Sequence, residues 1–151
     1  MIRNEAEYKE AVDRIKEEQE RLAEHKLALK EEGLDPEQIK RLTDPIASFY
    51  EQLVDDVRSY ERLSRGEFEA LKNLHGLGRM LVGLRIYLGL SQRQLAEQLG
   101  ADPSQVSRDE RNEYHNISVD RVSRILDALG VSLISTLNLT DHSPDENRRA
   151  A

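Results

Sequence analysis

The sequence predicts an all-α protein with one short strand near its C-terminus. Residues 4–32 contain no glycine or proline and consist largely of good helix formers. Apolar residues recur at three- and four-residue spacing through most of the chain, which is typical of amphipathic helices. Only residues 131–139 alternate apolar and polar residues with a period of two, which indicates a strand. The 151 residues suit one domain or two small ones.

The first element is predicted as a helix over residues 4–32, which Gly33 ends. Its apolar positions alternate between four- and three-residue spacing, the pattern of a helix packed along another helix. The predicted seam contains Tyr8, Val12, Ile15, Gln19, Leu22, Lys26 and Leu29. Because Gln19 and Lys26 are polar, we do not expect a long isolated coiled coil.

The second element is predicted in two steps. An aspartate followed by proline occurs at 35–36 and again at 44–45, and this pair suits the start of a helix. We therefore expect a short helix over 36–42 and a longer one over 45–64, nearly collinear and kinked near Pro45. One apolar stripe runs along both: Ile39, Leu42, Ile46, Phe49, Leu53, Val57 and Tyr60.

Residues 1–66 are predicted to form an antiparallel helical hairpin, because this stripe can face that of the first helix. The sequence leaves the role of the hairpin open: a structural core, a dimer surface, or a docking site for another protein. Gly66 marks its end, and the weakly patterned residues 67–75 are predicted to be a linker or a short helix.

Four further helices are expected between residues 76 and 130. They are predicted over 77–88, 91–99, 103–111 and 119–129. Gly100 joins the middle two, and its access to positive φ suits a tight helix exit. Asp102 is a good N-cap and Pro103 a good first residue for the next helix. Val106 then faces the core. The side chains left outward are Ser104, Gln105, Ser107 and Arg108.

In order and spacing, residues 77–130 resemble the Cro/repressor (XRE-type) helix-turn-helix family. The resemblance rests on Leu90-Ser91-Gln92, Gln94-Leu95-Ala96, Leu99-Gly100, Val106-Ser107-Arg108, Glu110-Arg111 and residues 125–130. It implies a repressor-type helix-turn-helix domain over 76–130, whose helix 103–111 enters the DNA major groove. Two positions depart from the family pattern, because Asp109 replaces an apolar residue and Asn112 replaces a glycine.

The resemblance implies a DNA-binding surface, and the outward faces agree with it. Near phosphates we expect Gln92, Arg93 and Arg111. In the groove we expect Ser104, Gln105, Ser107 and Arg108. Arg108 is the expected base contact, because a guanidinium can pair bidentately with guanine. The alternative is that Arg108 pairs on the surface with Asp109 or Glu110. Asp102 is expected to act only as a cap, since a carboxylate facing phosphates is unfavourable.

Charge is distributed unevenly along a chain of net charge −7. Residues 1–75 carry 13 Lys and Arg against 19 Asp and Glu. Residues 76–151 carry 9 against 10, and all nine cations there are arginine. Arginine binds phosphate and guanine edges bidentately, which lysine cannot do. The acidic half either weakens non-specific DNA binding by repulsion or is simply a solvated helical surface.

Composition argues against several other classes of protein. There is no cysteine, so disulfides and cysteine-based zinc fingers are excluded. The four histidines lie on different predicted elements without metal-ligand spacing, and we expect no metal and no cofactor. No phosphate-binding loop, nucleophile elbow or apolar carboxylate pair is present, so we do not expect an enzyme. Without a signal peptide or a membrane-spanning run, a cytoplasmic protein is expected.

The C-terminal strand, placed within 131–140, suggests how two copies associate. A lone strand leaves its backbone donors and acceptors unpaired, but pairing with the same segment of a second copy satisfies them. The residues expected at this dimer contact are Val131, Leu133, Leu137 and Leu139. HipB-like regulators use a comparable intersubunit strand, which the resemblance implies here. Residues 141–151 are polar and are expected to be a flexible tail.

The sequence therefore predicts a DNA-binding transcriptional regulator that represses as a homodimer on an inverted-repeat operator. Its partners are double-stranded DNA and a second copy, with no membrane association. An alternative comes from the likeness in architecture to HigA-like and HipB-like antitoxin regulators. In that alternative, the N-terminal helices bind and neutralise a toxin, while the helix-turn-helix regulates its own gene.

Overall fold

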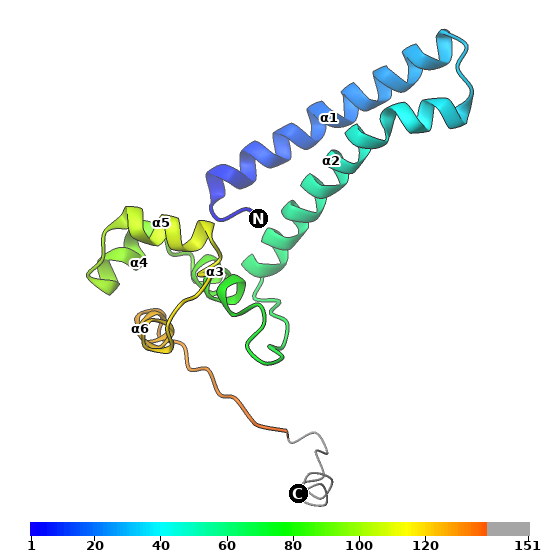
Figure 1. Ribbon diagram of the computed structural model, residues 1–151. Coiled ribbons are helices and arrows are strands. Elements are labelled where there is room, and N and C mark those ends of the chain that lie inside the picture. The colour runs from blue at the N-terminus through cyan, green and yellow to red at the C-terminus, as the bar shows by residue number, and fades with distance from the viewer. Residues whose placement is uncertain (139–151) are drawn as a thin grey trace, which may run out of the picture.

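The computed structural model describes residues 1–138, and this part of the chain contains six helices and no strand. The helices are α1 (Glu5–Glu31), α2 (Pro36–Ser64), α3 (Leu77–Tyr87), α4 (Gln92–Leu99), α5 (Pro103–Arg111) and α6 (Val119–Leu129). Figure 1 shows α1 and α2 as a long hairpin that projects from a compact group of the four shorter helices. The all-α prediction is confirmed for these residues.

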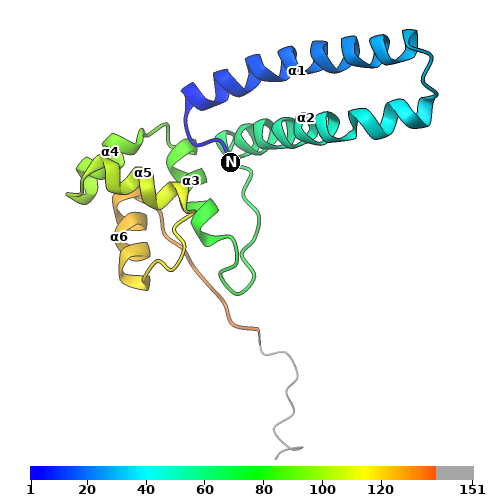
Figure 2. The same cartoon turned by 45° about the horizontal axis from the view of Figure 1, so that its top comes forward.

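The two long helices run side by side in opposite directions, as both views show (Figures 1 and 2). Each begins at a side-chain cap. The Asn4 side chain accepts a hydrogen bond from the Glu7 N–H at 2.9 Å, and Asp35 and Gln38 form a reciprocal capping box at the start of α2. The predicted hairpin is present, and its first helix has nearly the predicted bounds.

The seam between α1 and α2 differs from the prediction. Gln19 and Lys26 are exposed, whereas Ala11 is buried and Glu18 and His25 are half-buried. Positions 18 and 25 lie one residue before the predicted 19 and 26 and flank the central positions from the other side, while the predicted Val12 is half-buried and packs against the same apolar cluster as Ala11. Because both choices keep alternating three- and four-residue spacing, periodicity alone could not separate them.

The second long helix is continuous, where the sequence predicted two. Pro45 lies inside α2, and the helix changes direction in its first part (Figure 1). Proline lacks the N–H that would bond to the carbonyl of Arg41, so it bends the helix without ending it. Thr43 is buried, and its hydroxyl donates to the carbonyl of Ile39 at 2.9 Å. The expected kink is present, but the expected break is not.

The segment that joins the hairpin to α3 is irregular, and it packs against that helix. Phe68 meets the ring of Tyr87 edge to face, with ring centroids 6.0 Å apart. Gly83 on α3 faces Leu63 and Phe68, and a Cβ added at Gly83 would lie 2.7 Å from Leu63 Cδ2. The segment predicted as a linker or short helix is therefore a packed connection without helical structure.

Two apolar cores meet at α3. The larger one fills the space among α3, α4, α5 and α6, and its least exposed members are Leu81, Val82, Leu95, Ala96, Val106 and Ile125. The smaller one joins the two long helices and contains Ile2, Ala11, Val57 and Tyr60. Ile86 packs against both cores. The base of the hairpin is therefore in apolar contact with the four-helix group.

The turn between α5 and α6 has an unusual backbone. Glu113, Tyr114 and Asn116 all have positive φ, whereas Asn112 has φ −91°. Tyr114 is nevertheless buried in the larger core. Burial is the first cause that raises the pKa of the Tyr114 phenol well above its ordinary value, and Glu110 adds to the effect.

The predicted C-terminal strand is absent from residues 131–138, which have no regular secondary structure. Val131 packs against the larger core, but Leu133 and Leu137 are exposed, the latter by 94%. A strand requires a hydrogen-bonded neighbour, and no other strand lies within the described residues of this chain. Leu139, the end of the predicted strand and the expected tail lie outside the described residues.

Candidate nucleic-acid interface

Two short capped helices joined by a tight turn form the candidate interface. Ser91 caps α4 and forms a reciprocal pair of hydrogen bonds with Gln94. Gly100 ends α4 with φ 61°, as predicted, and Asp102 accepts a bond from the Ser104 N–H at 2.8 Å at the start of α5. Short polar side chains and one glycine therefore fix how the two helices follow each other.

Helix α5 has one buried side and one open side. Val106 and Glu110, four residues apart, are buried at 1% exposure each. The exposed residues on the other side are Ser104, Gln105, Arg108 and Arg111, and Ser107 is half-buried. All five sequence-predicted residues of α5 thus belong to a single helix of nine residues. Their arrangement matches a polar helix face that is available to a large ligand.

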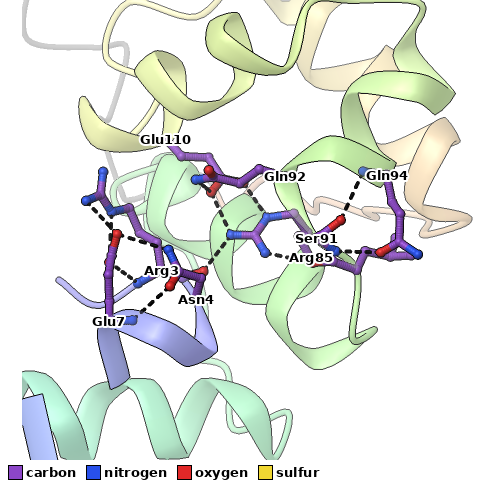
Figure 3. Close-up of polar contacts among 9 residues, drawn as sticks. Arg3, Asn4, Glu7, Arg85, Ser91, Gln92, Gln94 and Glu110 are labelled. Carbon is purple, nitrogen blue, oxygen red and sulfur yellow. Dashed lines mark hydrogen bonds and ion pairs between the residues drawn. The ribbon is translucent and has the colours of Figure 1, made fainter. Parts of the chain in front are cut away.

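A buried ion pair underlies this helix and was missed by the sequence analysis. Arg85 on α3 donates to Glu110 through Nε at 2.5 Å and through Nη2 at 2.6 Å (Figure 3). Their side chains are only 3% and 0% exposed. A signal was available, because Glu110 lies one helical turn after the inward-facing Val106. Arg85 likewise lies in an apolar run, between Leu84 and Ile86.

Gln92 belongs to this buried pair as well as to the predicted surface. Its side-chain amide donates to Glu110 Oε2 at 2.8 Å, and the residue is half-buried (Figure 3). The structure therefore links the start of α4 to the interior side of α5. Arg93, next along α4, is exposed and pairs with Glu97 at 3.0 Å. An exposed pair of this kind exchanges readily for another anion.

Arg108 does not form the surface ion pairs considered as the alternative. Asp109 pairs with Arg121 on α6 at 2.5 Å, and Glu110 pairs with Arg85. The Arg108 guanidinium is exposed and makes a long contact of 3.4 Å with the Ser104 carbonyl of its own helix. No acidic side chain within residues 1–138 forms a salt bridge with it. Arg108 therefore projects from α5 with its charge available.

Asp102 has the environment of a helix cap. Hydrogen bonds from Ser104, through its side chain and its backbone N–H, hold the pKa of the Asp102 carboxyl below its ordinary value. Arg108 adds a smaller effect in the same direction. The carboxylate is thus stabilised in its charged form at the start of α5, where a helix dipole also favours negative charge.

Within residues 1–138, no group of three or more His, Asp or Glu side chains is arranged to hold a metal ion. No helix in the same residues is long and apolar enough to cross a membrane. Helices α4 and α5 instead carry exposed hydrogen-bond donors and arginine side chains.

Comparison with known proteins found a match for this part of the chain. A family model described as helix-turn-helix matches residues 84–134, about a third of the chain. The match begins inside α3, spans α4, α5 and α6, and ends in the irregular segment after them. No curated protein and no solved structure matches the chain.

Proposed function

We propose that this protein is a transcriptional repressor of the Cro/repressor type whose α5 binds a specific DNA sequence, and the match of residues 84–134 to the helix-turn-helix family model supports this proposal. The observation that carries the proposal is the outer face of α5. That face holds Ser104, Gln105, Ser107, Arg108 and Arg111, while the opposite face is anchored by Val106 and Glu110. A rigid helix with polar side chains on one side suits the major groove.

The roles proposed for individual residues follow from where they lie. Arg108 has a free guanidinium and would contact a base edge, while Ser104 and Gln105 lie earlier on the same helix. Arg93 lies at the start of α4 and would release its ion-pair partner Glu97 to contact a DNA phosphate instead. Gln92 would combine a phosphate contact with its bond to Glu110.

The first experiment is a selection of random duplex sites with the full chain, followed by affinity measurements on the selected duplex. We expect Arg108→Ala to weaken binding by about 1–3 kcal/mol and to relax specificity at one base position. Arg93→Ala should weaken binding on all sequences and lower the salt dependence by about one counterion. Arg124→Ala, which removes an exposed arginine on α6, is the matched control.

Selection of no duplex by the wild-type chain would overturn the proposal. An equal loss on every sequence for Arg108→Ala would make Arg108 a phosphate contact only. Repression itself is tested by a reporter gene placed behind the selected site.

We further propose that the protein acts as a homodimer on an inverted repeat. Support comes from the exposed apolar residues that follow α6, with Leu133 40% and Ile134 86% exposed. Pairing residues 131–139 with the same segment of a second copy would cover them and satisfy the backbone. Two recognition helices related by a two-fold axis would then contact half-sites about 34 Å apart.

A second candidate function is binding of a partner protein, such as a toxin, by the hairpin. A groove in its distal half is lined by apolar and lysine side chains, including Lys26, Lys30, Leu34, Ile39, Lys40 and Ala47. Co-purification with the product of a neighbouring gene tests this function. Ile39→Asp should abolish such binding, whereas Leu27→Asp, at a 59% exposed position outside the groove, should not.

A further inference from the structure

The buried Arg85 guanidinium has a partner from outside the helix-turn-helix domain. Two of its bonds go to Glu110, and Nη1 donates to the Leu90 carbonyl at 2.8 Å. The second Nη2 hydrogen is donated to the backbone carbonyl of Arg3, also at 2.8 Å (Figure 3). Four of the five guanidinium donors are thus used, and one of them reaches a residue 82 positions earlier in the chain.

The carbonyl of Arg3 is held in place by the start of the hairpin. Glu7 accepts hydrogen bonds from the Arg3 backbone N–H at 2.9 Å and from its Nη2 at 3.1 Å. Ile2 is buried at 6% exposure in the smaller core. Asn4 caps α1 immediately afterwards. The first turn of α1 therefore fixes where the Arg3 carbonyl points.

On its other side, Arg85 sets the positions of both helices of the candidate interface. Glu110 belongs to α5, and its second oxygen also accepts from Gln92 on α4. Leu90, whose carbonyl accepts from Arg85, lies in the turn that leads into α4. A continuous series of hydrogen bonds therefore leads from α1 through Arg3 and Arg85 to α5.

We propose that Ile2, Arg3 and Glu7 are positioning residues for DNA recognition. They hold the Arg3 carbonyl on Arg85, and Arg85 in turn holds Glu110 and Gln92, so that α5 presents its outer face at a fixed angle to α4. This inference rests on the proposed DNA-binding function and adds to it a role for the hairpin. The hairpin is then energetically coupled to the DNA-binding surface.

The physical basis is the cost of leaving a buried guanidinium donor without an acceptor. If the Arg3 carbonyl moves away, Arg85 must shift toward another acceptor or admit water, and either change alters its fit to Glu110. Coupling of this kind is reciprocal, so DNA binding should also stabilise the first residues of the chain.

The test uses full-length variants and the duplex selected by the wild-type chain. Glu7→Ala removes the clamp on Arg3 and leaves the apolar cores intact, with Glu10→Ala at an exposed site of α1 as its matched control. Ile2→Asp displaces the residues before α1, because it places a carboxylate in the smaller core. Ile2→Val is the conservative control for this variant. Three quantities are measured: the dissociation constant, the NMR resonance of the Arg85 Nε–H group, and the hydrogen exchange of the backbone amides of residues 2–8.

We expect Glu7→Ala to raise the dissociation constant about fivefold, and Ile2→Asp to raise it further. Glu10→Ala, at an exposed site, and Ile2→Val, which keeps an apolar side chain in the smaller core, should each change it less than about twofold. The Arg85 Nε–H resonance should shift in the same order. Hydrogen exchange of the amides of residues 2–8 in the wild-type chain should slow when the duplex binds.

Each result decides the proposal. Unchanged affinity in both Glu7→Ala and Ile2→Asp overturns it, even if the Arg85 resonance moves, because the contact would then be structural only. Amide exchange that is unaffected by duplex overturns the reciprocal coupling, and the proposal with it. A wild-type chain that selects no duplex refutes the proposed function itself, whereas binding that tolerates both variants refutes only the role of the hairpin.

Discussion

Gly78 on α3 lies directly against the backbone carbonyl of Glu113, so that a Cβ atom added to Gly78 would come within 1.7 Å of the carbonyl oxygen. No side chain can occupy that space unless the two segments separate. The α5–α6 turn, with its positive φ at Glu113 and Tyr114, is thus seated on the first turn of α3. The contact fixes the C-terminal end of α5 relative to the core.

We expect Gly78→Ala to destabilise the fold by about 3 kcal/mol or more, because backbone atoms must move to admit the methyl group. Gly83→Ala is the matched control, since the atoms nearest to its methyl group would be side-chain atoms of Leu63 and Phe68 rather than backbone. The gain in helix propensity of about 1 kcal/mol then offsets much of the crowding. Urea unfolding of both variants measures the difference, and similar losses would contradict this account.

Removal of one member of the Arg85–Glu110 pair should be strongly destabilising. Arg85→Met or Glu110→Leu alone is expected to cost about 3–5 kcal/mol, because the remaining charge stays buried without its partner. The double variant should lose clearly less than the sum of the two. Urea unfolding of the full double-mutant cycle gives the coupling energy. Additive losses would show that the two charges act independently.

The lowered pKa of Asp102 predicts that the start of α5 is sensitive to acid. A carboxyl whose folded pKa is depressed stabilises the fold above its unfolded pKa, and this contribution is lost as pH falls through the folded pKa. Asp102→Asn keeps a capping side chain but cannot ionise. Thermal unfolding between about pH 7 and about pH 2.5 should therefore show wild type losing Tm relative to Asp102→Asn. Parallel curves would contradict the prediction.

Dimerisation through the segment after α6 predicts a specific sensitivity to proline. Ile134→Pro should yield monomers and weaken binding to the inverted repeat, because proline removes a backbone donor and blocks strand pairing. Ile134→Val, which keeps strand propensity, should remain dimeric. Sedimentation velocity distinguishes the two. If a chain ending at Gly130 still sediments as a dimer, the hairpin must hold the subunits together.

The proposed division of the chain predicts that a fragment can fold alone. A fragment that starts at Gly66 keeps Phe68 on Tyr87 and all of the larger core except for its contact with Met1. We expect it to remain helical and to bind the selected duplex more weakly than the full chain, because Arg85 loses the Arg3 carbonyl. Circular dichroism and duplex titration check this. If the fragment is unfolded, folding of the four shorter helices depends on the hairpin.

Local patterns predicted most helices, because their signals lie within a few residues. Asp35 and Asp102 before prolines and Gly100 after α4 all mark boundaries where the structure has them. Pro45 was over-weighted as a helix start, because packing along α1 sustains α2 through it. On α1 the predicted seam lies one residue too late at positions 19 and 26, whereas Val12 packs against the smaller core as predicted; only the partner helix decides between the two sides.

The contacts beneath the interface were harder to predict. Helical spacing from Val106 allows a buried Glu110, but a charged residue in that position suggests solvent unless its partner is known, and Glu110 was considered only as a surface partner of Arg108. The bond from Arg85 to Arg3 joins residues that no local pattern relates. A strand at 131–138 requires a neighbouring strand, and residues 1–138 of one chain contain none. The alternation of apolar residues was therefore insufficient to predict the structure of this segment.

The tyrosines of this tryptophan-free chain lie in separate regions, which gives the protein its own optical labels. Tyr8 and Tyr60 stack with centroids 5.0 Å apart at the base of the hairpin, whereas Tyr114 is enclosed by the helix-turn-helix core. Because the chain contains no tryptophan, its ultraviolet emission comes from tyrosines in both regions. Tyr50 and Tyr87 emit as well. With those two replaced by phenylalanine, a further replacement of Tyr114 or of the stacked pair would assign each remaining part of the signal, so that melting of the two regions could be followed separately without an added dye.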